Sequence, residues 1–497
     1  MVRFRKNVNR EQMNINFSNW ISKLLKLCFL LFSCLVTLGI LTYCFLLYQM
    51  RGLKSSVLLI FCMICAFLAI AFACYILAII PESERNNIIV LSILLIVFVL
   101  ISCLWIYKTP MQQTSDYETF WQTTLKALKG KAIYQTDNNY FAKWAYQTGF
   151  LTYLMLVVKF LGTHIRILQL LNIFYQVIIL ILLYCITKRL WQKIIFCRWC
   201  VFLMAINMEW FCLNNRLSNQ YIAMMFFLAS LYLIMCNYSI KTWLLAGIFL
   251  AIGNFLRPIG VIYLAGIIVF EVIYSIIDDL KNGKQNFLRL LTFILTYFLL
   301  LTGFSLAVKA TGLNEYGLSN RDSLWKLVTG LNYQSAGTYR KFIDEKFNLT
   351  ESRVEMAQRE EEVTKENVQY LNHNHLWLKL FIRKFNCLWS YPSNSLNYAL
   401  SRKNCGYLTY YLLLILAYSI NAVEMIFMLI GAFSLVTKKL PDKAYLLILI
   451  LFAYVAAQLI IEVQGRYRIE FTPILIIYSL FGIQTVLQKF EKKEVQL

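Results

Sequence analysis

The stretch IIVLSILLIVFVLISCLWIYKTPMQQTSDYETFW, residues 88–121, decides the fold. Residues 88–107 carry no charged side chain, and a helix needs about twenty apolar residues to cross the hydrocarbon core of a bilayer. A polar segment that contains Asp116 and Glu118 then follows. This order predicts a membrane-spanning helix whose end delivers two carboxylates to the membrane surface.

Apolar blocks of the same kind recur along the whole chain. Hydrophobic residues make up 59% of the 497 residues, charged residues 15%, and the mean hydropathy is +0.59. In soluble domains, roughly 45–50% of the residues are hydrophobic and about 25% are charged. The composition therefore predicts an all-α, polytopic integral membrane protein with about 12 transmembrane helices. The expected spans are residues 24–49, 55–80, 88–107, 166–187, 194–212, 220–237, 242–256, 259–277, 288–308, 408–436, 443–461 and 472–488.

One further block, residues 149–163, is apolar but too short for a full crossing, and it predicts a re-entrant or juxtamembrane helix. Basic residues in short loops orient the other spans. The N-terminal segment is basic, and a cytoplasmic start places the later basic clusters on the same side. Both termini are therefore expected in the cytoplasm, with the polar segments 108–148 and 309–407 outside. The basic clusters are Arg3/Arg5/Lys6/Arg10 and those within residues 188–198, 281–289, 438–443 and 489–493.

Several function classes do not fit the sequence. The net charge is +22, but the basic residues gather at the ends of apolar blocks, and no nucleic-acid recognition motif is present. Most of the 14 cysteines lie in apolar blocks, where small buried hydrophobes are expected rather than disulfides or zinc ligands. His373 and His375 have no acidic or cysteine partner at a metal-binding spacing, which favours a polar loop.

The chain divides into four parts. Residues 1–87 hold a cytoplasmic tail and two spans, and residues 88–308 form a transmembrane core with the external loop 108–148. Residues 309–407 predict an external helical module, because a charged run is followed by an amphipathic stretch suited to the membrane surface. Residues 408–497 hold the last spans and a second cytoplasmic tail.

The first external loop carries the candidate chemistry. Asp116 and Glu118 stand beside Tyr117 and Trp121, and Tyr146 follows in the same loop. A carboxylate at the membrane surface suits a general base that acts on a hydroxyl acceptor. Two nearby carboxylates could instead bind a divalent cation such as Mg or Mn. An ordinary interfacial loop with an aromatic belt is the third interpretation.

The order of several motifs carries a family resemblance. The motifs are Asp116 after an early span, Ala127 to Tyr134, Lys143 to Gly149, the short block ending Lys159-Phe160-Leu161-Gly162, Arg166, Lys188-Arg189-Leu190, Asn254-Phe255-Leu256-Arg257-Pro258, and Glu462 to Arg468 before Pro473. Together they resemble the GT-C superfamily of polyprenyl-phosphate-sugar-dependent glycosyltransferases, especially the branch of protein mannosyltransferases and lipid A aminoarabinose transferases. The chain departs from that pattern in two extra spans before Asp116 and in having no consecutive prolines at Lys143 to Tyr146.

The resemblance implies a GT-C-like fold and an inverting transfer of a sugar from a polyprenyl-phosphate donor to a cell-envelope acceptor. The acceptor would be a polymer, a glycolipid or a protein. Asp116 is the implied base, with Glu118 beside it. The implied contacts to the lipid phosphate or the sugar are Lys143, Arg257, Arg466, Arg468, Tyr117, Trp121 and Tyr146.

Two other functions stay open. An O-antigen-type polysaccharide polymerase or ligase would also have many spans and large external loops, and Asp116 would be dispensable in it. A lipid-linked oligosaccharide flippase or other transporter should carry paired polar groups at mid-membrane, whereas the ionisable residues here gather near the outer interface. The abundance of Ile, Lys and Asn favours a bacterial protein of the plasma membrane.

Overall fold

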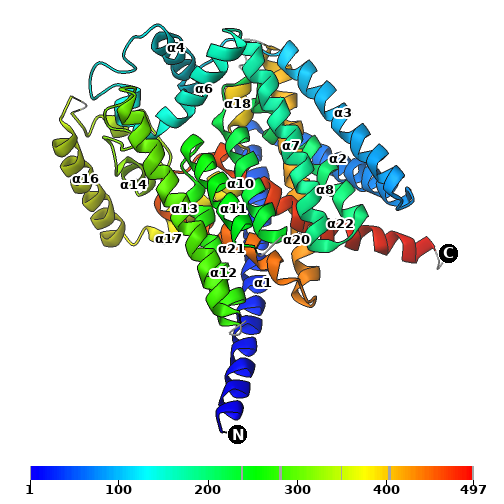
Figure 1. Ribbon diagram of the computed structural model, residues 1–497. Helices are drawn as coiled ribbons and strands as arrows, with labels where there is room; N and C mark the ends of the chain where they lie inside the picture. Colours follow the sequence, from blue (N-terminus) through cyan, green and yellow to red (C-terminus); the bar gives the residue numbers. More distant parts are fainter. Residues whose placement is uncertain (1, 237–238, 279–281, 349, 401–404, 495–497) are drawn as a thin grey trace.

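The computed structural model describes residues 2–236, 239–278, 282–348, 350–400 and 405–494, with side chains from residue 17 to residue 489. Every regular element in these ranges is a helix (Figure 1). The prediction of an all-α polytopic membrane protein is confirmed. The predicted basic residues Arg3, Arg5, Lys6, Arg10, Lys281, Lys492 and Lys493 lie outside the described side chains.

The chain begins with three long apolar helices, α1 (Val2–Arg51), α2 (Leu53–Ile79) and α3 (Glu84–Lys108). Helix α1 is central, because it buries Phe29, Phe32 and Val36 against later parts of the chain. The Phe32 ring meets the Trp389 ring edge-on, with the ring centroids 5.2 Å apart. Most large apolar side chains of α2 and α3 are exposed, as expected of helices that face lipid.

Short helices follow α3 and bring the chain back to the bundle. They are α4 (Asp116–Leu128), α5 (Tyr140–Lys143), η1 (Ala145–Gln147) and α6 (Thr148–Leu161). The apolar helix Ala145–Leu161 is too short to be a candidate span. The prediction that residues 149–163 do not make a full crossing is therefore consistent with the length of this helix.

The middle of the chain forms the transmembrane core. Its elements are α7 (Ile165–Trp191), α8 (Ile194–Ile206), α9 (Met208–Phe211), η2 (Cys212–Asn215), α10 (Asn219–Cys236), α11 (Ile240–Leu256), α12 (Gly260–Glu271), η3 (Val272–Ile277) and α13 (Gly283–Ala310).

The segment after α13 folds into short helices with two small apolar clusters of their own. One cluster centres on Trp325, Val328 and Met356, and the other joins Leu331, Leu371 and Leu380. The elements are α14 (Trp325–Gly330), α15 (Lys341–Asp344), α16 (Arg353–His373), α17 (Trp377–Phe385), η4 (Asn386–Ser390) and α18 (Ser395–Ala399). The chain ends with α20 (Tyr407–Val436), α21 (Asp442–Ile460), η5 (Gly465–Glu470) and α22 (Thr472–Glu494).

Nine helices in the described part of the chain are long and apolar enough to cross a membrane, or up to 10 if a bent pair counts as one span. About twelve crossings were expected. The block 194–212 is bent by 57° between α8 and the following helix. The break lies at Asn207, whose side chain accepts a hydrogen bond from the backbone of Trp210 at 2.9 Å. The expected span 242–256 corresponds to α11, which has only 17 residues. The expected span 472–488 lies in α22, which is not among the candidate spans.

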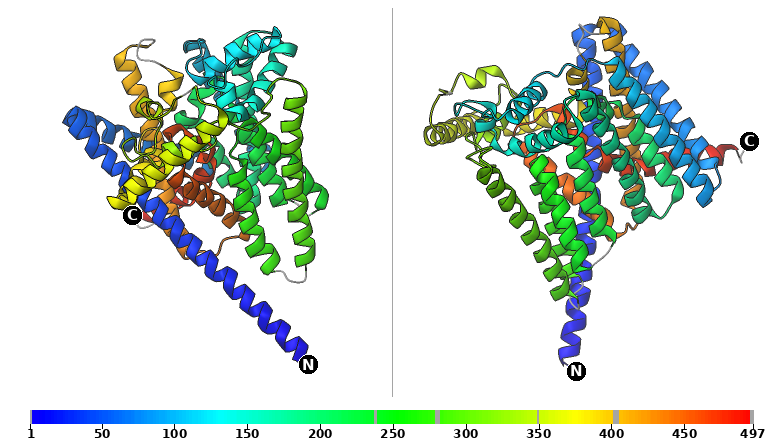
Figure 2. Two further views of the ribbon diagram at one scale, coloured as in Figure 1. Left: turned by 90° about the vertical axis from the view of Figure 1, so that its left-hand side faces the viewer. Right: turned by 45° about the horizontal axis from the view of Figure 1, so that its top comes forward.

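The two ends of the bundle differ in chemistry. At one end, Lys26 donates to the backbone carbonyl oxygens of Val436 and Lys438, at 2.8 and 3.0 Å. Arg189 donates to that of Met235, at 3.1 Å. The N-terminus lies toward this end, whereas α4, α6 and α16 lie away from it (Figures 1 and 2). The alternation of the spans and the compartment that each end of the bundle faces stay predictions.

Helices α20 and α22 approach each other backbone to backbone. A Cβ atom at Gly482 would lie 1.9 Å from the carbonyl oxygen of Phe427, and one at Gly431 would lie 2.5 Å from that of Tyr478. Small residues at a helix crossing permit this distance. The last helix is therefore held by van der Waals contact along its backbone.

We expect Gly482→Ala to lower stability by about 1–3 kcal/mol, because the added methyl group must push the two helices apart. Gly303→Ala is the matched control, since a Cβ atom there meets no atom within 4 Å. That exchange should be neutral or stabilise α13 by up to about 1 kcal/mol. Thermal unfolding of both variants in one detergent measures the difference. Equal midpoints would contradict the close crossing.

Candidate functional site

The connection between α21 and α22 organises the polar end of the molecule. It contains the short 3-10 helix η5, which turns once in about three residues. Neighbouring side chains of η5 therefore point in different directions. Arg466 faces the start of α4, whereas Arg468 is buried on another side.

Asp116 opens α4 at the polar end of the bundle. The preceding residue, Ser115, has a φ of 55°, in the left-handed region that non-glycine residues rarely adopt. The Asp116 carboxylate is 44% exposed, and its Oδ2 atom lies 3.7 Å from Nη2 of Arg466. The carboxylate is therefore accessible to a substrate while one side of it faces a guanidinium.

Three further side chains fix the position of Arg466. Its Nη1 donates to the Tyr117 hydroxyl at 2.9 Å, and its Nε donates to Oε1 of Gln464 at 3.0 Å. The guanidinium carbon lies 4.2 Å from the centre of the Tyr398 ring, a cation–π contact. Arg466 thus links α4, α18 and η5 beside the Asp116 carboxylate.

Arg257 reaches the same place from the end of α11. Pro258 follows it, and Arg257 itself has the extended conformation that a residue before proline favours. Its Nε lies 2.5 Å from Oε1 of Glu470, and its Nη1 donates to Oδ1 of Asn219 at 3.0 Å. Burial raises the pKa of Glu470, and the Arg257 guanidinium opposes that rise only in part.

Lys326 of α14 supplies a third cation. Its Nζ lies 2.6 Å from Oε2 of Glu462, and Gln464 donates to the other oxygen of that carboxylate at 2.6 Å. Burial raises the pKa of Glu462, but the Lys326 ammonium and the Gln464 amide lower it below its ordinary value. Conversely, burial lowers the pKa of Lys326, while Glu462 and two tyrosines raise it above its ordinary value. Both groups of this pair are therefore charged near neutral pH.

The three cations surround one ring. Arg257, Lys326 and Arg466, here called the cation cluster, lie 5.6, 5.8 and 5.9 Å from the centre of the Tyr467 ring. Each has one carboxylate partner, namely Glu470, Glu462 and Asp116. Guanidinium and ammonium groups gathered in this way can bind a phosphate, because each offers several N–H donors.

Lys384 of α17 joins the external helices to this connection. Its buried ammonium donates to the carbonyl oxygens of Gly330, Leu459 and Ile461, at 2.7, 2.9 and 2.9 Å. Burial lowers the pKa of Lys384 to about 7, and the Glu462 carboxylate acts in the opposite direction. Gly330 allows the close approach, since a Cβ atom there would lie 2.1 Å from the carbonyl oxygen of Ile460. The contact places Lys326 beside Glu462.

Arg216, like Lys384, joins distant segments through their backbone carbonyl oxygens. It is buried and donates to the carbonyl oxygens of Tyr398 and Ala399 at 2.6 and 3.2 Å, and also to that of Gln112. Gln112 precedes Asp116 in the same segment. Arg216 therefore connects α18, which carries Tyr398, to the segment that carries Asp116.

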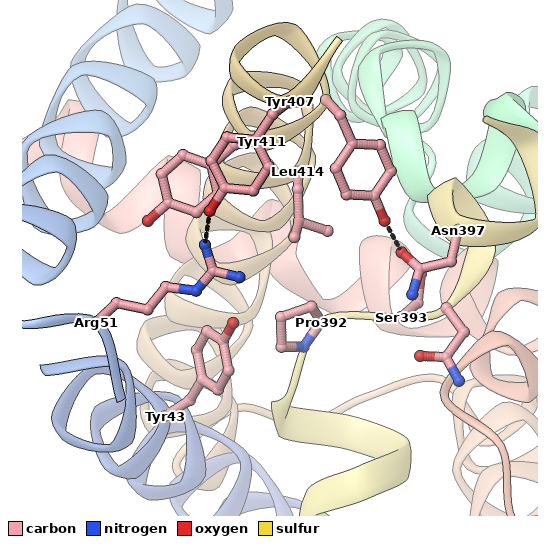
Figure 3. Close-up of a pocket in the computed structure, with 10 residues that line it drawn as sticks. Tyr43, Arg51, Pro392, Ser393, Asn397, Tyr407, Tyr411 and Leu414 are labelled. Atoms are coloured by element: carbon pink, nitrogen blue, oxygen red, sulfur yellow. Dashed lines mark hydrogen bonds between the residues drawn. The ribbon is translucent and has the colours of Figure 1, made fainter. Parts of the chain in front are cut away.

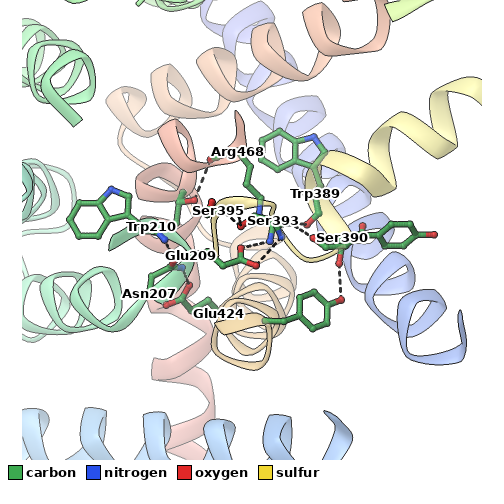
Figure 4. A network of polar contacts seen from close by, with 12 residues as sticks. Asn207, Glu209, Trp210, Trp389, Ser390, Ser393, Ser395, Glu424 and Arg468 are labelled. Carbon is green, nitrogen blue, oxygen red and sulfur yellow. Dashed lines mark hydrogen bonds and ion pairs between the residues drawn. The ribbon is translucent and has the colours of Figure 1, made fainter. Parts of the chain in front are cut away.

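Arg468 lies in a separate buried network (Figure 4). It pairs with Glu209 and donates to the carbonyl oxygens of Trp389 and Tyr391 at 3.2 and 2.7 Å. Glu209 also accepts a hydrogen bond from the backbone of Ser393 at 3.0 Å. These contacts hold the segment before α18, and Arg468 is only 2% exposed.

The structure brings together Asp116, Tyr117, Arg257 and Arg466 of the predicted site residues. The other predicted site residues are Glu118, Trp121, Lys143, Tyr146 and Arg468, and they occupy different positions. Glu118 faces outward and accepts a hydrogen bond from Gln122 at 2.7 Å.

Among the others, burial lowers the pKa of Lys143, and the charged groups that act on Lys143 are Asp322, Arg321 and Asp344. Trp121 is buried on the inner side of α4. Tyr146 accepts a hydrogen bond from Gln147 at 3.4 Å and is half-buried. Within the described ranges, none of these residues forms a hydrogen bond or an ion pair with Arg466.

The predicted divalent cation fits the residues only in part. Two carboxylates, Asp116 and Glu118, stand at the start of α4, and one of them faces the Arg466 guanidinium. No group of three or more His, Cys, Asp and Glu side chains in the described residues could hold a metal ion. The cation stays a prediction, and no chemical step below depends on it.

Sequence reasoning missed Lys326, Tyr398, Tyr467 and Glu470. Lys326 and Tyr398 lie far along the chain from Asp116, so no spacing signals their approach. Glu470 follows Arg466 and Arg468 closely, and an acid beside two arginines was an available signal. Glu462 entered the sequence analysis only as the start of the segment that leads to Arg468, and it pairs with Lys326.

Comparison with known proteins gives a likeness in structure but none in sequence. No protein-family model and no curated protein matches the chain. Among solved structures, the chain matches the archaeal oligosaccharyltransferase AglB from Archaeoglobus fulgidus, in complex with an inhibitory peptide and a dolichol-phosphate, with 13% identity and a TM-score of 0.49. The match covers 83% of this chain and 52% of that one. The chain thus spans about half of that protein.

We expect Lys384→Met to loosen the contact between α14 and the end of α21, because three buried carbonyl oxygens lose their donor at about 1–3 kcal/mol each. Hydrogen exchange at residues 325–337 and 459–463 measures the loosening. Lys379→Met on the exposed face of α17 is the control. Unchanged exchange in Lys384→Met would show that Lys384 does not hold this contact.

Proposed function

We propose that the protein is a GT-C-type membrane glycosyltransferase that moves a sugar from a polyprenyl phosphate to a cell-envelope acceptor. The observation that carries the proposal is the cation cluster around Tyr467, placed beside the accessible carboxylate of Asp116. The site lies at the polar end of helices that are long enough to span a membrane. We place the protein in a bacterial plasma membrane, with this end outside.

A lipid-linked sugar phosphate suits this location. Its hydrocarbon tail stays in the bilayer, so its phosphate must sit near the membrane surface. Arginine offers a planar fork of donors that matches phosphate oxygens, and lysine adds a point charge. Arg257, Lys326 and Arg466 are 17, 39 and 11% exposed. Each therefore keeps part of its charged group within reach of a ligand.

Charge balance favours a donor with one phosphate. The three cations of the cluster face three carboxylates, so the cluster has no large excess of positive charge without substrate. The phosphodiester of the donor carries one negative charge. A second negative charge develops on the phosphate as it leaves. Removing unpaired charge from water is costly, and the extra charge of a diphosphate would be harder to accommodate here.

The proposed reaction needs one base and one stabilised leaving group. Asp116 takes the proton of an acceptor hydroxyl, and the oxygen attacks the anomeric carbon of the sugar. The bond from that carbon to the phosphate oxygen breaks, and its electron pair stays on the phosphate. Arg257, Lys326 and Arg466 stabilise the charge that develops on the leaving phosphate. Attack opposite to the leaving group inverts the anomeric centre.

The other predicted residues take different parts in the proposal. Arg468 supports the site from behind, because its guanidinium is buried against Glu209 and backbone carbonyl oxygens. Tyr117 positions Arg466 through its hydroxyl. The exposed helices of residues 309–407 contribute Lys326 to the site and are proposed to select the acceptor.

A transporter is the second candidate, and one contact favours it. Asn207 donates to Oε2 of Glu424 at 2.6 Å, and both side chains are buried between helices. Polar pairs inside a membrane often mark transport pathways. A flippase or an O-antigen-type polymerase would not need Asp116 as a base. The variant below therefore separates both alternatives from sugar transfer.

We expect Asp116→Asn to lower the rate of sugar transfer by about 10²–10⁴-fold, because the amide cannot accept the proton of the acceptor. The assay supplies radiolabelled polyprenyl-phosphate sugars to membranes that contain equal amounts of each variant. Glu118→Gln is the matched control and should retain most of the activity, since Glu118 faces outward. Full activity in Asp116→Asn would exclude Asp116 as the base.

The paired change Lys326→Met/Glu462→Gln tests the cation cluster without leaving a buried carboxylate unpaired. Loss of one charged donor should raise the KM for the lipid donor by about 10–100-fold. Lys131→Met, at an exposed position of the first external segment, is the control. An unchanged KM together with normal folding would show that Lys326 does not contact the donor.

A further inference from the structure

A cavity of about 130 Å³ lies beside α18 (Figure 3). It forms where α1 ends, where α20 begins and where the segment before α18 passes between them. Helix α1 belongs to the part of the chain that precedes the Asp116 loop. The lining residues are Tyr43, Arg51, Pro392, Ser393, Asn394, Asn397, Tyr407, Tyr410, Tyr411 and Leu414.

Among the described residues, the lining carries one cation, Arg51, and no carboxylate. Arg51 points into the cavity (Figure 3), and its Nη1 donates to the Tyr407 hydroxyl at 2.7 Å. A guanidinium has five N–H donors, and no other acceptor of Arg51 is found in the described residues. Several donors of Arg51 are therefore available to a bound anion.

Flat rings and amides complete the lining. The rings of Tyr407 and Tyr411 are nearly parallel, with an angle of 7° and centroids 6.2 Å apart, and Arg51 lies 4.9 Å from the Tyr411 ring centre. Asn397 accepts a hydrogen bond from the Tyr410 hydroxyl through Oδ1, so its amide nitrogen can still donate. Aromatic faces beside amide and hydroxyl groups suit a ligand with both C–H surfaces and hydroxyl groups.

Helix α18 separates the cavity from the cation cluster. Asn394 and Asn397 line the cavity, whereas the neighbouring Tyr398 stacks on Arg466 at 4.2 Å. A ligand in the cavity would therefore lie one short helix away from Asp116 and Arg466. This distance is suitable for another part of a long molecule that also reaches the site.

We propose that this cavity binds one unit of an acidic glycan, a sugar ring that carries a carboxylate or a phosphate group. Arg51 binds the acidic group, a tyrosine ring lies against the sugar, and the asparagine amides bind its hydroxyl groups. The proposal is limited to one sugar unit because the cavity is small, about 130 Å³. The inference rests on the cavity and its lining, so it can fail or succeed independently of the proposed sugar transfer.

An anionic phospholipid headgroup is the competing occupant, because the cavity lies at the ends of membrane helices. The lining favours the glycan, since it offers several amides and hydroxyl groups for each positive charge. A phosphate-dominated ligand would be better served by additional cations. The test below includes phospholipid as one of its outcomes.

The experiment is a binding titration of the full chain in nanodiscs made of phosphatidylcholine alone. The acidic probes are trigalacturonic acid and glucose 6-phosphate, and the neutral probe is the matching galactose trimer. We expect at least one acidic probe to bind and the neutral trimer to bind more weakly. Arg51→Gln should weaken the acidic probe by about 10–100-fold, as expected for the loss of a charged hydrogen bond.

Lys54→Gln, at an exposed position close to Arg51 in the sequence, is the matched control and should leave binding unchanged. Tyr411→Ala should weaken both kinds of trimer, because it removes a face of the cavity. The proposal is overturned if neither acidic probe binds, or if Arg51→Gln and Lys54→Gln behave alike. It is also overturned if nanodiscs with phosphatidylglycerol abolish glycan binding and Arg51→Gln abolishes lipid retention.

Discussion

Charge pairing at the edge of a membrane is the constraint on which the rest of the structure depends. Charged groups near hydrocarbon are costly unless they are paired or solvated. The connection between α21 and α22 meets this constraint through Glu462, Arg466 and Glu470, each of which has an oppositely charged partner from another part of the chain. These pairs fix the start of α4, the end of α11 and the start of α14 relative to one another. Tyr467 lies at the centre of the three cations that result.

Buried cations outside the cluster hold the surrounding segments in place. Lys384, Arg216 and Arg468 all donate to backbone carbonyl oxygens, and each joins segments that are distant in sequence. Backbone carbonyl oxygens in a buried place need donors, and a cation can satisfy two or three of them together. The helices thus provide a rigid frame, and the buried cations attach the short outer helices to it. Both kinds of contact are needed to place Lys326 and Asp116 at one site.

The sequence was sufficient for the helical class and for part of the site. Uncharged blocks predicted most spans, and the order of motifs singled out Asp116, Arg257 and Arg466, which the structure brings together. Lys326 could not be found, because a pairing between distant segments leaves no spacing. Arg468 was expected beside Arg466, but a 3-10 turn directs the two side chains to different places. The bend at Asn207 was also missed, since its apolar flanks are indistinguishable from a continuous span.

The central claim is that Arg257, Lys326 and Arg466 together bind the phosphate of a lipid donor. The most direct measurement is a structure of the full chain in nanodiscs with an added polyprenyl monophosphate. The account predicts a phosphate within hydrogen-bonding distance, about 2.7–3.2 Å, of donors from at least two of these residues. It also predicts that the sugar-bearing side of the phosphate faces Asp116. A phosphate bound elsewhere, with the cation cluster unchanged and empty, would contradict the account.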